Sequence, residues 1–205
     1  IPDNGTIKIC GYDILKEPIK AKECIGYVPQ DISLMEDLTA YDNLEFFGAL
    51  YGLKGKELKE RIQEALEVTG LLEKKKDKVK KFSGGMKRRL NIAAAIMHHP
   101  KVLIMDEPTA NLDPIVRNEI LEIISEHMLS EEISTFYSSH ITTDFEKCAD
   151  YVVFIYNGKV FLQGEKDEIL ENHVLVKFKK DLYDKEIENE FISISKNEFG
   201  YEGLI

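Results

Sequence analysis

The sequence has little positive charge to set against its negative charge. Its 205 residues contain 27 Lys and Arg against 37 Asp and Glu, which gives a formal net charge of −10. Nucleic-acid binding needs clustered Lys and Arg that contact phosphates, so this balance argues against DNA or RNA as a main partner. It is equally unfavourable for direct adhesion to anionic lipid. We therefore expect no nucleic-acid partner.

Cysteines and long apolar runs are also scarce. Cys10, Cys24 and Cys148 are odd in number and form no C-x-x-C pair, which fits a reducing compartment better than a disulfide framework. No apolar run approaches the roughly 18 residues that span a bilayer, and no signal peptide is visible. Residues 1–5 look like a turn leading into a strand. We expect an intracellular chain, truncated at its N-terminus and without direct membrane insertion.

The one basic stretch has two readings. Lys74-Lys75-Lys76 continues to Lys80-Lys81 and is interrupted by Asp77. A solvated loop is favoured roughly four to one over a binding patch, because runs of like charge usually face water.

The first 81 residues predict two short strands followed by a helical insertion. The strands are residues 6–10 and 24–28, and Gly11-Tyr12-Asp13 forms the turn after the first. Thr39 can cap a helix whose apolar residues fall on one face: Leu44, Phe47, Leu50 and Tyr51. A second helix, through residues 58–68, ends at Gly70. Residues 40–81 therefore form a helical insertion with amphipathic faces.

From Ser83 onward, helices alternate with strands. Residues 84–98 predict a helix, and the continuous apolar run 102–105 is typical of a strand inside a parallel sheet. Pro114 opens another helix, with these residues as its buried side: Ile115, Ile120, Leu121, Ile124 and Met128. Residues 133–137 predict the next strand, so the fold class is α/β with a parallel sheet. Strands at residues 151–155 and 160–162 flank Asn157-Gly158, a pair typical of a hairpin turn. Residues 173–205 begin with apolar residues at alternate positions: Val174, Val176 and Phe178.

Two carboxylates follow the strand at 102–105. Ligands of open parallel sheets bind at the carboxyl ends of the strands, where Asp106 and Glu107 lie. One carboxylate can hold a hydrated Mg²⁺, and the next can orient or deprotonate an attacking water. A strand that simply ends in exposed acids is an equally good explanation of this pair alone.

A serine and two glycines open the helix at 84–98. Ser83 as N-cap with Gly84 and Gly85 would expose free backbone N–H groups at the positive end of a helix, which suits a phosphate. A flexible loop joined to a capped helix is the commoner explanation. The basic residues that follow, Lys87 to Arg89, can be ordinary solvated charges.

His140 follows the strand at 133–137 and should open on the same edge as Asp106. There it could contact a γ-phosphate or position the water. A lone histidine at a strand end is usually structural, so its significance depends on the residues around it.

The order of these features resembles the ATP-binding cassette (ABC) ATPase family. Gln30 resembles the Q-loop glutamine, residues 82–86 the signature motif, and residues 102–107 the Walker B strand with its catalytic glutamate. Residues 110–113 resemble the D-loop, and His140 the switch histidine. The resemblance covers roughly residues 5–165.

This resemblance implies a P-loop NTPase-like core with a helical subdomain and an antiparallel β portion, truncated at the N-terminus. The implied division is a partial core at 1–39, a helical subdomain with the signature at 40–98, the remaining core at 99–172 and an extension at 173–205. It also implies that the whole protein binds ATP with Mg²⁺ and hydrolyses it.

The resemblance further implies roles for residues and partners. Ser83, Gly84 and Gly85 would contact ATP held by a second ATPase subunit in a head-to-tail dimer, with Asp113 communicating across it. Gln30 and Asp106 would serve Mg²⁺, mainly through water, Glu107 the attacking water and His140 the γ-phosphate. The segments 86–90 and 38–47 are similar to exporters of the ABC-2 type. A transmembrane permease would then be the partner, docking near residues 40–53, and the subunit would lie in the cytoplasm at the inner face of the membrane. Core packing is at least as good an explanation of any single aromatic there.

The sequence departs from the family pattern at two points. Met86 replaces the signature glutamine, which is tolerated in this subfamily. More importantly, neither Gly55-Lys56 nor Gly158-Lys159 fits the phosphate-binding pattern G-x-x-x-x-G-K-[ST]. We expect the loop to lie before Ile1, and the chain itself to bind ATP weakly or not at all.

Two other functions stay open on the sequence alone. One is a non-transport ABC protein acting on ribosomes or DNA, which the charge of −10 disfavours. The other is a non-hydrolysing regulatory or binding partner, which a phosphate-binding loop encoded upstream would exclude.

Overall fold

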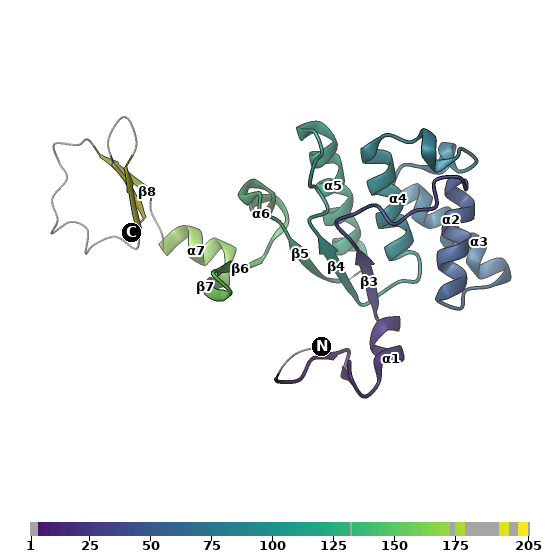
Figure 1. Ribbon diagram of the computed structural model, residues 1–205, viewed down its shortest axis with the longest axis horizontal. Coiled ribbons are helices and arrows are strands. Elements are labelled where there is room, and N and C mark those ends of the chain that lie inside the picture. Colours follow the sequence, from purple (N-terminus) through teal and green to yellow (C-terminus); the bar gives the residue numbers. More distant parts are fainter. Residues whose placement is uncertain (1–3, 132, 173–174, 179–192, 197–200, 205) are drawn as a thin grey trace. The chain divides into compact units, whose positions relative to one another are not determined.

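The computed structural model describes residues 4–131, 133–172, 175–178, 193–196 and 201–204 (Figure 1). The chain divides into two compact units, residues 1–144 and residues 145–205. Among the described helices, none combines the length and the apolar character needed to cross a membrane.

A three-stranded parallel sheet forms the centre of the first unit. Its strands are β3 (Ile25–Val28), β4 (Val102–Asp106) and β5 (Ser134–Ser138), in the order β3-β4-β5. Val28 pairs with Met105, and Asp106 pairs with Ser138, so the three strands end at one edge of the sheet. The helix α5 (Pro114–Glu131) lies in the connection from β4 to β5, as a parallel pair requires. The α/β parallel sheet predicted from the sequence is confirmed.

One face of this sheet is buried and the other is not. Leu103 and Met105 are buried in the hydrophobic core, whereas Tyr27 and Phe136 are 52% and 67% exposed on the opposite face. The alternation of inward and outward side chains along a strand explains this difference. The strand predicted at 102–105 does lie inside the parallel sheet, between β3 and β5, with its buried side chains on one face.

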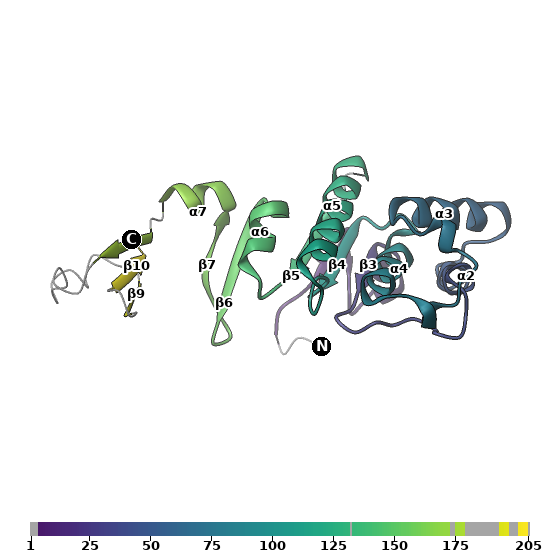
Figure 2. The same cartoon turned by 90° about the horizontal axis from the view of Figure 1, so that it is seen from above.

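Three helices and two short 3₁₀ turns pack beside the sheet (Figures 1 and 2). They are α2 (Ala40–Leu50), α3 (Gly55–Val68), η1 (Leu72–Lys74), η2 (Val79–Lys81) and α4 (Gly84–Ile96). Every residue from Leu90 to Met97 is buried, because α4 contacts α2, α3, α5 and β3. The strand β3 approaches α4 closely, since a Cβ on Gly26 would lie 2.3 Å from the carbonyl oxygen of Ala95.

The segment leading into α2 is fixed by two polar residues. Thr39 forms the predicted cap: its hydroxyl accepts from the N–H of Asp42, and the Asp42 carboxylate accepts from the N–H of Thr39. Asn43 is fully buried and bonds both backbone groups of Met35, at 2.8 Å to the N–H and 3.0 Å to the carbonyl. The chain between Gln30 and α2 is thereby tied to the helix.

The predicted buried face of α5 is wrong at its first turn, and the apolar face of α2 is exposed at its end. Leu50 and Tyr51 at the end of α2 are 67% and 38% exposed, and Ile115 in the first turn of α5 is 72% exposed. Terminal turns extend beyond the neighbours that bury the middle of each helix, so periodicity overestimates their burial. Ile120, Leu121 and Ile124 are buried as expected, and the side chain of Met128 lies outside the described residues.

The N-terminal residues and the lysine run lie at the surface of this unit. β1 (Lys8–Ile9) and β2 (Tyr12–Asp13) form a hairpin whose turn is Cys10-Gly11, so the predicted turn at residues 11–13 is displaced by one residue. A helix, α1 (Pro18–Glu23), leads into β3. In the lysine run, Lys80 pairs with Asp37 at 2.9 Å and the other lysines are exposed, which fits the solvated interpretation.

The second unit contains the predicted hairpin. α6 (Thr142–Cys148) crosses the boundary between the units, and β6 (Tyr151–Tyr156) pairs with β7 (Lys159–Glu165). Asn157 and Gly158 have φ values of 49° and 72°, as a two-residue hairpin turn requires. α7 (Lys166–Asn172) follows, and then an antiparallel sheet in the order β8-β10-β9. Its strands are Leu175–Phe178, Ser193–Lys196 and Tyr201–Leu204, whereas Val174 lies outside the described residues.

Arg88 of α4 ties the segment after β3 to the core. Its side chain is 4% exposed, and its guanidinium donates to the carbonyl oxygens of Pro29, at 2.6 Å, and of Gln30. Burial lowers the pKa of Arg88, and the nearby Asp31 carboxylate opposes that shift. A buried cation is stable only where acceptors surround it, so these two carbonyls fix both the side chain and the backbone at Gln30.

Replacing Arg88 by Met should loosen this segment. The Pro29 and Gln30 carbonyls would lose their donor, at a cost of about 2–3 kcal/mol in the free energy of unfolding. Hydrogen exchange should accelerate at the amides of residues 30–34. Arg89→Met is the matched control, because Arg89 pairs instead with Glu119 of α5 at 2.9 Å. Equal acceleration in both variants would contradict the assigned role of Arg88.

His98 joins the end of α4 to both β3 and α2. Its Nε2–H donates to the carbonyl oxygen of Ile25 at 3.0 Å, and its ring stacks on Tyr51 with a centroid distance of 3.6 Å. Burial lowers the pKa of His98 to about 4, against an opposing contribution from the hydrogen bond to Ile25. The neutral imidazole is therefore the form that fits this position.

The folded protein should lose stability on mild acidification. Because the pKa of His98 is about 4 when folded and about 6.5 when unfolded, the unfolded chain binds more protons between these values. The contribution of neutral His98 to the free energy of unfolding is fully present above about pH 6.5 and is lost as the pH drops toward 4. The loss should be about 1 kcal/mol between pH 7.5 and 5.5. Urea denaturation at both pH values measures it. His98→Gln should flatten this dependence and His99→Gln should retain it; an unchanged slope in His98→Gln would refute the assignment.

Candidate functional site

The polar residues predicted from the sequence gather at the carboxyl edge of the parallel sheet. Asp106 is the last residue of β4, and Glu107 follows it directly. His140 comes two residues after the end of β5, and Gln30 two residues after the end of β3. Since the paired strands run in the same direction, all four positions lie along one edge.

Glu107 and His140 are in direct contact. Nδ1 of His140 lies 2.7 Å from Oε2 of Glu107, where it can donate to the carboxylate. The Glu107 side chain is 20% exposed and that of His140 is 70% exposed, so the pair faces solvent from the histidine side. A carboxylate held by an imidazole in this way can orient a neighbouring water and accept its proton.

The backbone at Glu107 has an uncommon conformation. Its φ is 46°, in the left-handed region that costs a non-glycine residue roughly 1–2 kcal/mol. The N–H of Glu107 compensates by donating to Ser138, with both the carbonyl oxygen and the hydroxyl oxygen at 3.1 Å. Such strain persists where surrounding bonds enforce it and is common at functional sites.

Asp106 offers an exposed carboxylate beside this pair. Its Oδ1 accepts a hydrogen bond of 2.8 Å from the Ser138 hydroxyl, which leaves its other oxygen available to a ligand. Among the described residues, no group of three or more His, Cys, Asp and Glu side chains could hold a metal ion. The Asp106 carboxylate could contribute to a site for Mg²⁺, which keeps several waters and takes few carboxylates.

The serine and glycines at the start of α4 have separate tasks. The Ser83 hydroxyl accepts from the N–H of Met86 at 3.3 Å, which confirms the predicted cap. Gly84 is exposed and has open space around its Cα, whereas a Cβ on Gly85 would lie 2.4 Å from Cγ1 of Val116. Gly85 is therefore required for the close packing of α4 on α5, and Gly84 leaves the helix end open to an approaching group.

Asp113 caps the helix that follows. Its Oδ1 accepts from the N–H groups of Ile115 and Val116, both at 3.1 Å, at the start of α5. The preceding turn contains Asn111, whose φ of 58° is one that asparagine tolerates. The structure thus gives Asp113 a local role in addition to the one that the family resemblance implies.

Two residues that hold this edge together were not predicted from the sequence. Arg88, expected as a solvated charge, is buried against the backbone of Gln30. Asp144, which carried no sequence signal, is 1% exposed and accepts hydrogen bonds from hydroxyl groups near Glu107 and His140. A buried polar residue becomes recognisable only when the elements around it are known.

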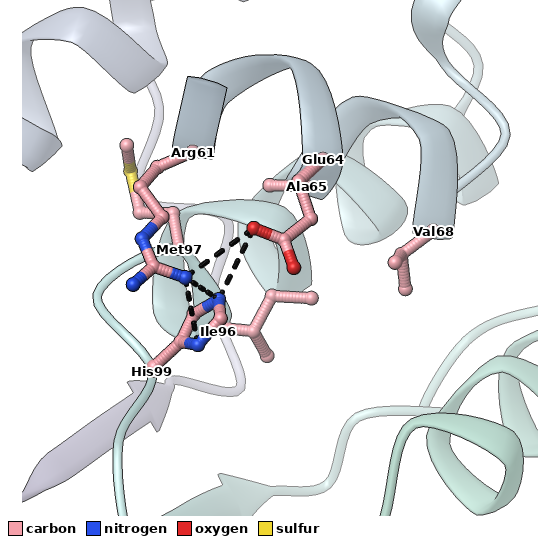
Figure 3. A pocket seen from close by; sticks show the side chains of 7 residues that line it. All are labelled: Arg61, Glu64, Ala65, Val68, Ile96, Met97 and His99. Atoms are coloured by element: carbon pink, nitrogen blue, oxygen red, sulfur yellow. Dashed lines mark hydrogen bonds and ion pairs between the residues drawn. The ribbon is translucent and has the colours of Figure 1, made fainter. Parts of the chain in front are cut away.

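The cavity in Figure 3 lies elsewhere, between α3 and the end of α4. It encloses about 10 Å³, which is room for about one water. Arg61 and Glu64 of α3 both contact the ring of His99, with Nε2 of His99 3.2 Å from the Glu64 carboxylate. None of its lining residues belongs to the strand-end group, so we interpret these contacts as packing between the two helices.

Comparisons with known proteins identify the family of this chain. The profile of the ABC transporter family matches residues 1–110. The linearmycin resistance ATP-binding protein LnrL of Bacillus subtilis (strain 168) is 48% identical over 82% of this chain and 53% of its own length. The Nod factor export ATP-binding protein I of Ralstonia nicotianae is 34% identical over 85% of this chain and 54% of its own.

A solved structure from an ABC transporter has the same fold. That of cbiO1 from Clostridium perfringens, part of the ABC transporter complex cbiONQ, superimposes with a TM-score of 0.76 at 31% identity. The match covers 83% of this chain and 70% of that one. The chain spans about half the length of the two sequence relatives. Its fold is that of the ABC ATPases, and the chain belongs to the ABC transporter family.

Proposed function

We propose that the whole protein is the ATP-binding and ATP-hydrolysing subunit of an ABC transporter of the exporter type. The observation that carries this proposal is the Glu107–His140 pair, 2.7 Å apart beside the exposed carboxylate of Asp106. The relatives support the transport context, since one is named for linearmycin resistance and another for Nod factor export.

The residues at the sheet edge suit the hydrolysis of a phosphoanhydride. Glu107 would accept a proton from a water that attacks the terminal phosphorus, while the bond from that phosphorus to the ADP oxygen breaks. His140 would hold the Glu107 carboxylate and contact the γ-phosphate. Gln30 and Asp106 would hold Mg²⁺, mainly through water, and the ion would neutralise charge on the phosphates.

The site would be completed by a second copy of the subunit. Ser83 and Gly84 form an exposed helix start, at which free N–H groups favour a phosphate. Gly85 would support that geometry through its packing on α5, and Asp113 would lie at the contact between the two subunits. A permease would dock on α2, where Phe46 and Leu50 are 48% and 67% exposed, at the inner face of the membrane.

The 205-residue chain should bind ATP weakly or not at all. Its sequence contains no G-x-x-x-x-G-K-[ST] loop, and such a loop supplies the lysine and most backbone donors for the β- and γ-phosphates. Isothermal titration with Mg·ATP should therefore give no micromolar binding. A micromolar dissociation constant would show that other residues cradle the phosphates.

Replacing Glu107 by Gln should stop turnover in a chain that also carries the phosphate-binding loop. The amide cannot take the proton from water, so kcat should fall by about 100-fold or more, and ATP affinity should stay within about twofold. A coupled assay of phosphate release measures kcat, and filter binding measures affinity.

Glu122→Gln, at an exposed position of α5, is the matched control and should retain wild-type turnover. If Glu107→Gln hydrolyses ATP at the wild-type rate, Glu107 does not activate the water. If the unmodified protein binds ATP without hydrolysing it, a non-hydrolysing regulatory role becomes the better assignment.

A further inference from the structure

A buried carboxylate lies behind the Glu107–His140 pair. Asp144, in the first turn of α6, is 1% exposed, and its Oδ2 is surrounded by hydroxyl groups. Thr109 donates to it at 2.6 Å and Tyr137 at 2.9 Å, and the hydroxyl of Ser139 lies 3.5 Å away. Thr109 is itself fully buried. The two short hydrogen bonds satisfy this oxygen at a point that solvent does not reach, where losing a donor is costly.

The hydroxyl groups come from the two segments that carry the site. Thr109 lies two residues after Glu107, in the segment that follows β4. Ser139 directly precedes His140, in the segment that follows β5, and its hydroxyl also accepts from the N–H of Ile141 at 3.0 Å. One carboxylate oxygen thus joins the loop of Glu107 to the loop of His140 at a point that solvent does not reach.

Tyr137 strengthens this junction. Its hydroxyl contacts Thr109 at 3.3 Å as well as Asp144. Burial raises the pKa of Tyr137 far above its ordinary value, and the neighbouring Asp144 carboxylate adds to the shift, so the hydroxyl stays protonated and keeps donating. Separating the two loops would leave a buried carboxylate with fewer donors, which is costly.

The position of Glu107 follows from restraints on both sides of it. On one side, Asp106 accepts a hydrogen bond from the Ser138 hydroxyl at 2.8 Å. On the other, Thr109 is held by Asp144. Glu107, which lies between these two restraints, has the left-handed backbone described above, which isolated chains avoid. Releasing Thr109 would allow the turn to relax and the carboxylate of Glu107 to move away from His140.

We propose that Thr109, Tyr137 and Asp144 are positioning residues for ATP hydrolysis, which hold the carboxylate of Glu107 against His140. This inference rests on the proposed function, because the reaction it concerns is that of Glu107. It goes beyond that proposal by assigning the geometry of the pair to a buried cluster that contacts neither substrate nor metal.

A pair of substitutions at Thr109 tests this proposal in a chain that carries the phosphate-binding loop. Thr109→Val keeps the shape of the side chain but removes the hydroxyl, whereas Thr109→Ser keeps the hydroxyl. We expect Thr109→Val to lower kcat by about 10-fold or more with KM for ATP within about twofold, and Thr109→Ser to stay within about threefold of wild type. Asp144→Asn should resemble Thr109→Val. Equal kcat in the Val variant and the wild type, or equal losses in the Val and Ser variants, would overturn the proposal.

A second measurement needs no turnover and separates this proposal from the proposed function. The ¹⁵N resonance of His140 Nδ1 reports its hydrogen bond to Glu107. It should shift in Thr109→Val and stay in place in Thr109→Ser, with circular dichroism showing that both variants are folded. An unshifted resonance in Thr109→Val would overturn the positioning role. A shifted resonance in a protein that shows no hydrolysis would support the positioning role and refute only the proposed activity.

Discussion

The parallel pairing of β4 with β5 is the constraint on which the site depends. Asp106 pairs with Ser138, so the residues that follow each strand emerge side by side, although they are more than 30 positions apart in the sequence. The pairing supplies more than proximity, because Ser138 donates to the Asp106 carboxylate and accepts from the N–H of Glu107. A shift of one residue in this register would turn every side chain of β5 to the other face and would separate the pair.

The buried helix α4 connects this edge to the rest of the first unit. Its first turn carries the exposed Ser83 and Gly84, and Gly85 allows it to lie against α5. One turn later, Arg88 fixes the backbone of Gln30, and the remaining turns are buried against α2, α3 and β3. A displacement of α4 would therefore move Gln30 and the helix start together. We infer that this helix is the physical link between the face proposed for a permease and the edge proposed for ATP.

The strand ends were predictable from the sequence, whereas the contacts that fix them were not. Glu107 and His140 each follow a short strand that the sequence predicts, and parallel strands of one sheet end at a common edge, so their juxtaposition follows from pattern alone. Arg88 stands between Lys87 and Arg89, and no local pattern distinguishes this buried cation from its half-buried neighbours, which pair with Glu36 and Glu119. Asp144 could not be predicted either, because its burial depends on hydroxyl groups from two other segments. The prediction for Ile115 was wrong in the other direction. Its helical periodicity predicted burial, but its side chain lies exposed in the first turn of α5.

The two halves of the proposed site differ in how firmly the chain holds them. Glu107 is restrained by Ser138, by His140 and, through Thr109, by Asp144, so its strained backbone is enforced from several directions. Ser83 makes only the capping bond to Met86 and Gly84 has open space around it, so these two residues of the helix start stay exposed. This difference is expected of a composite site. A group that activates water must be in place before the substrate arrives, because its alignment determines the barrier. A surface that closes on a nucleotide held by another subunit must instead remain accessible until the two subunits meet.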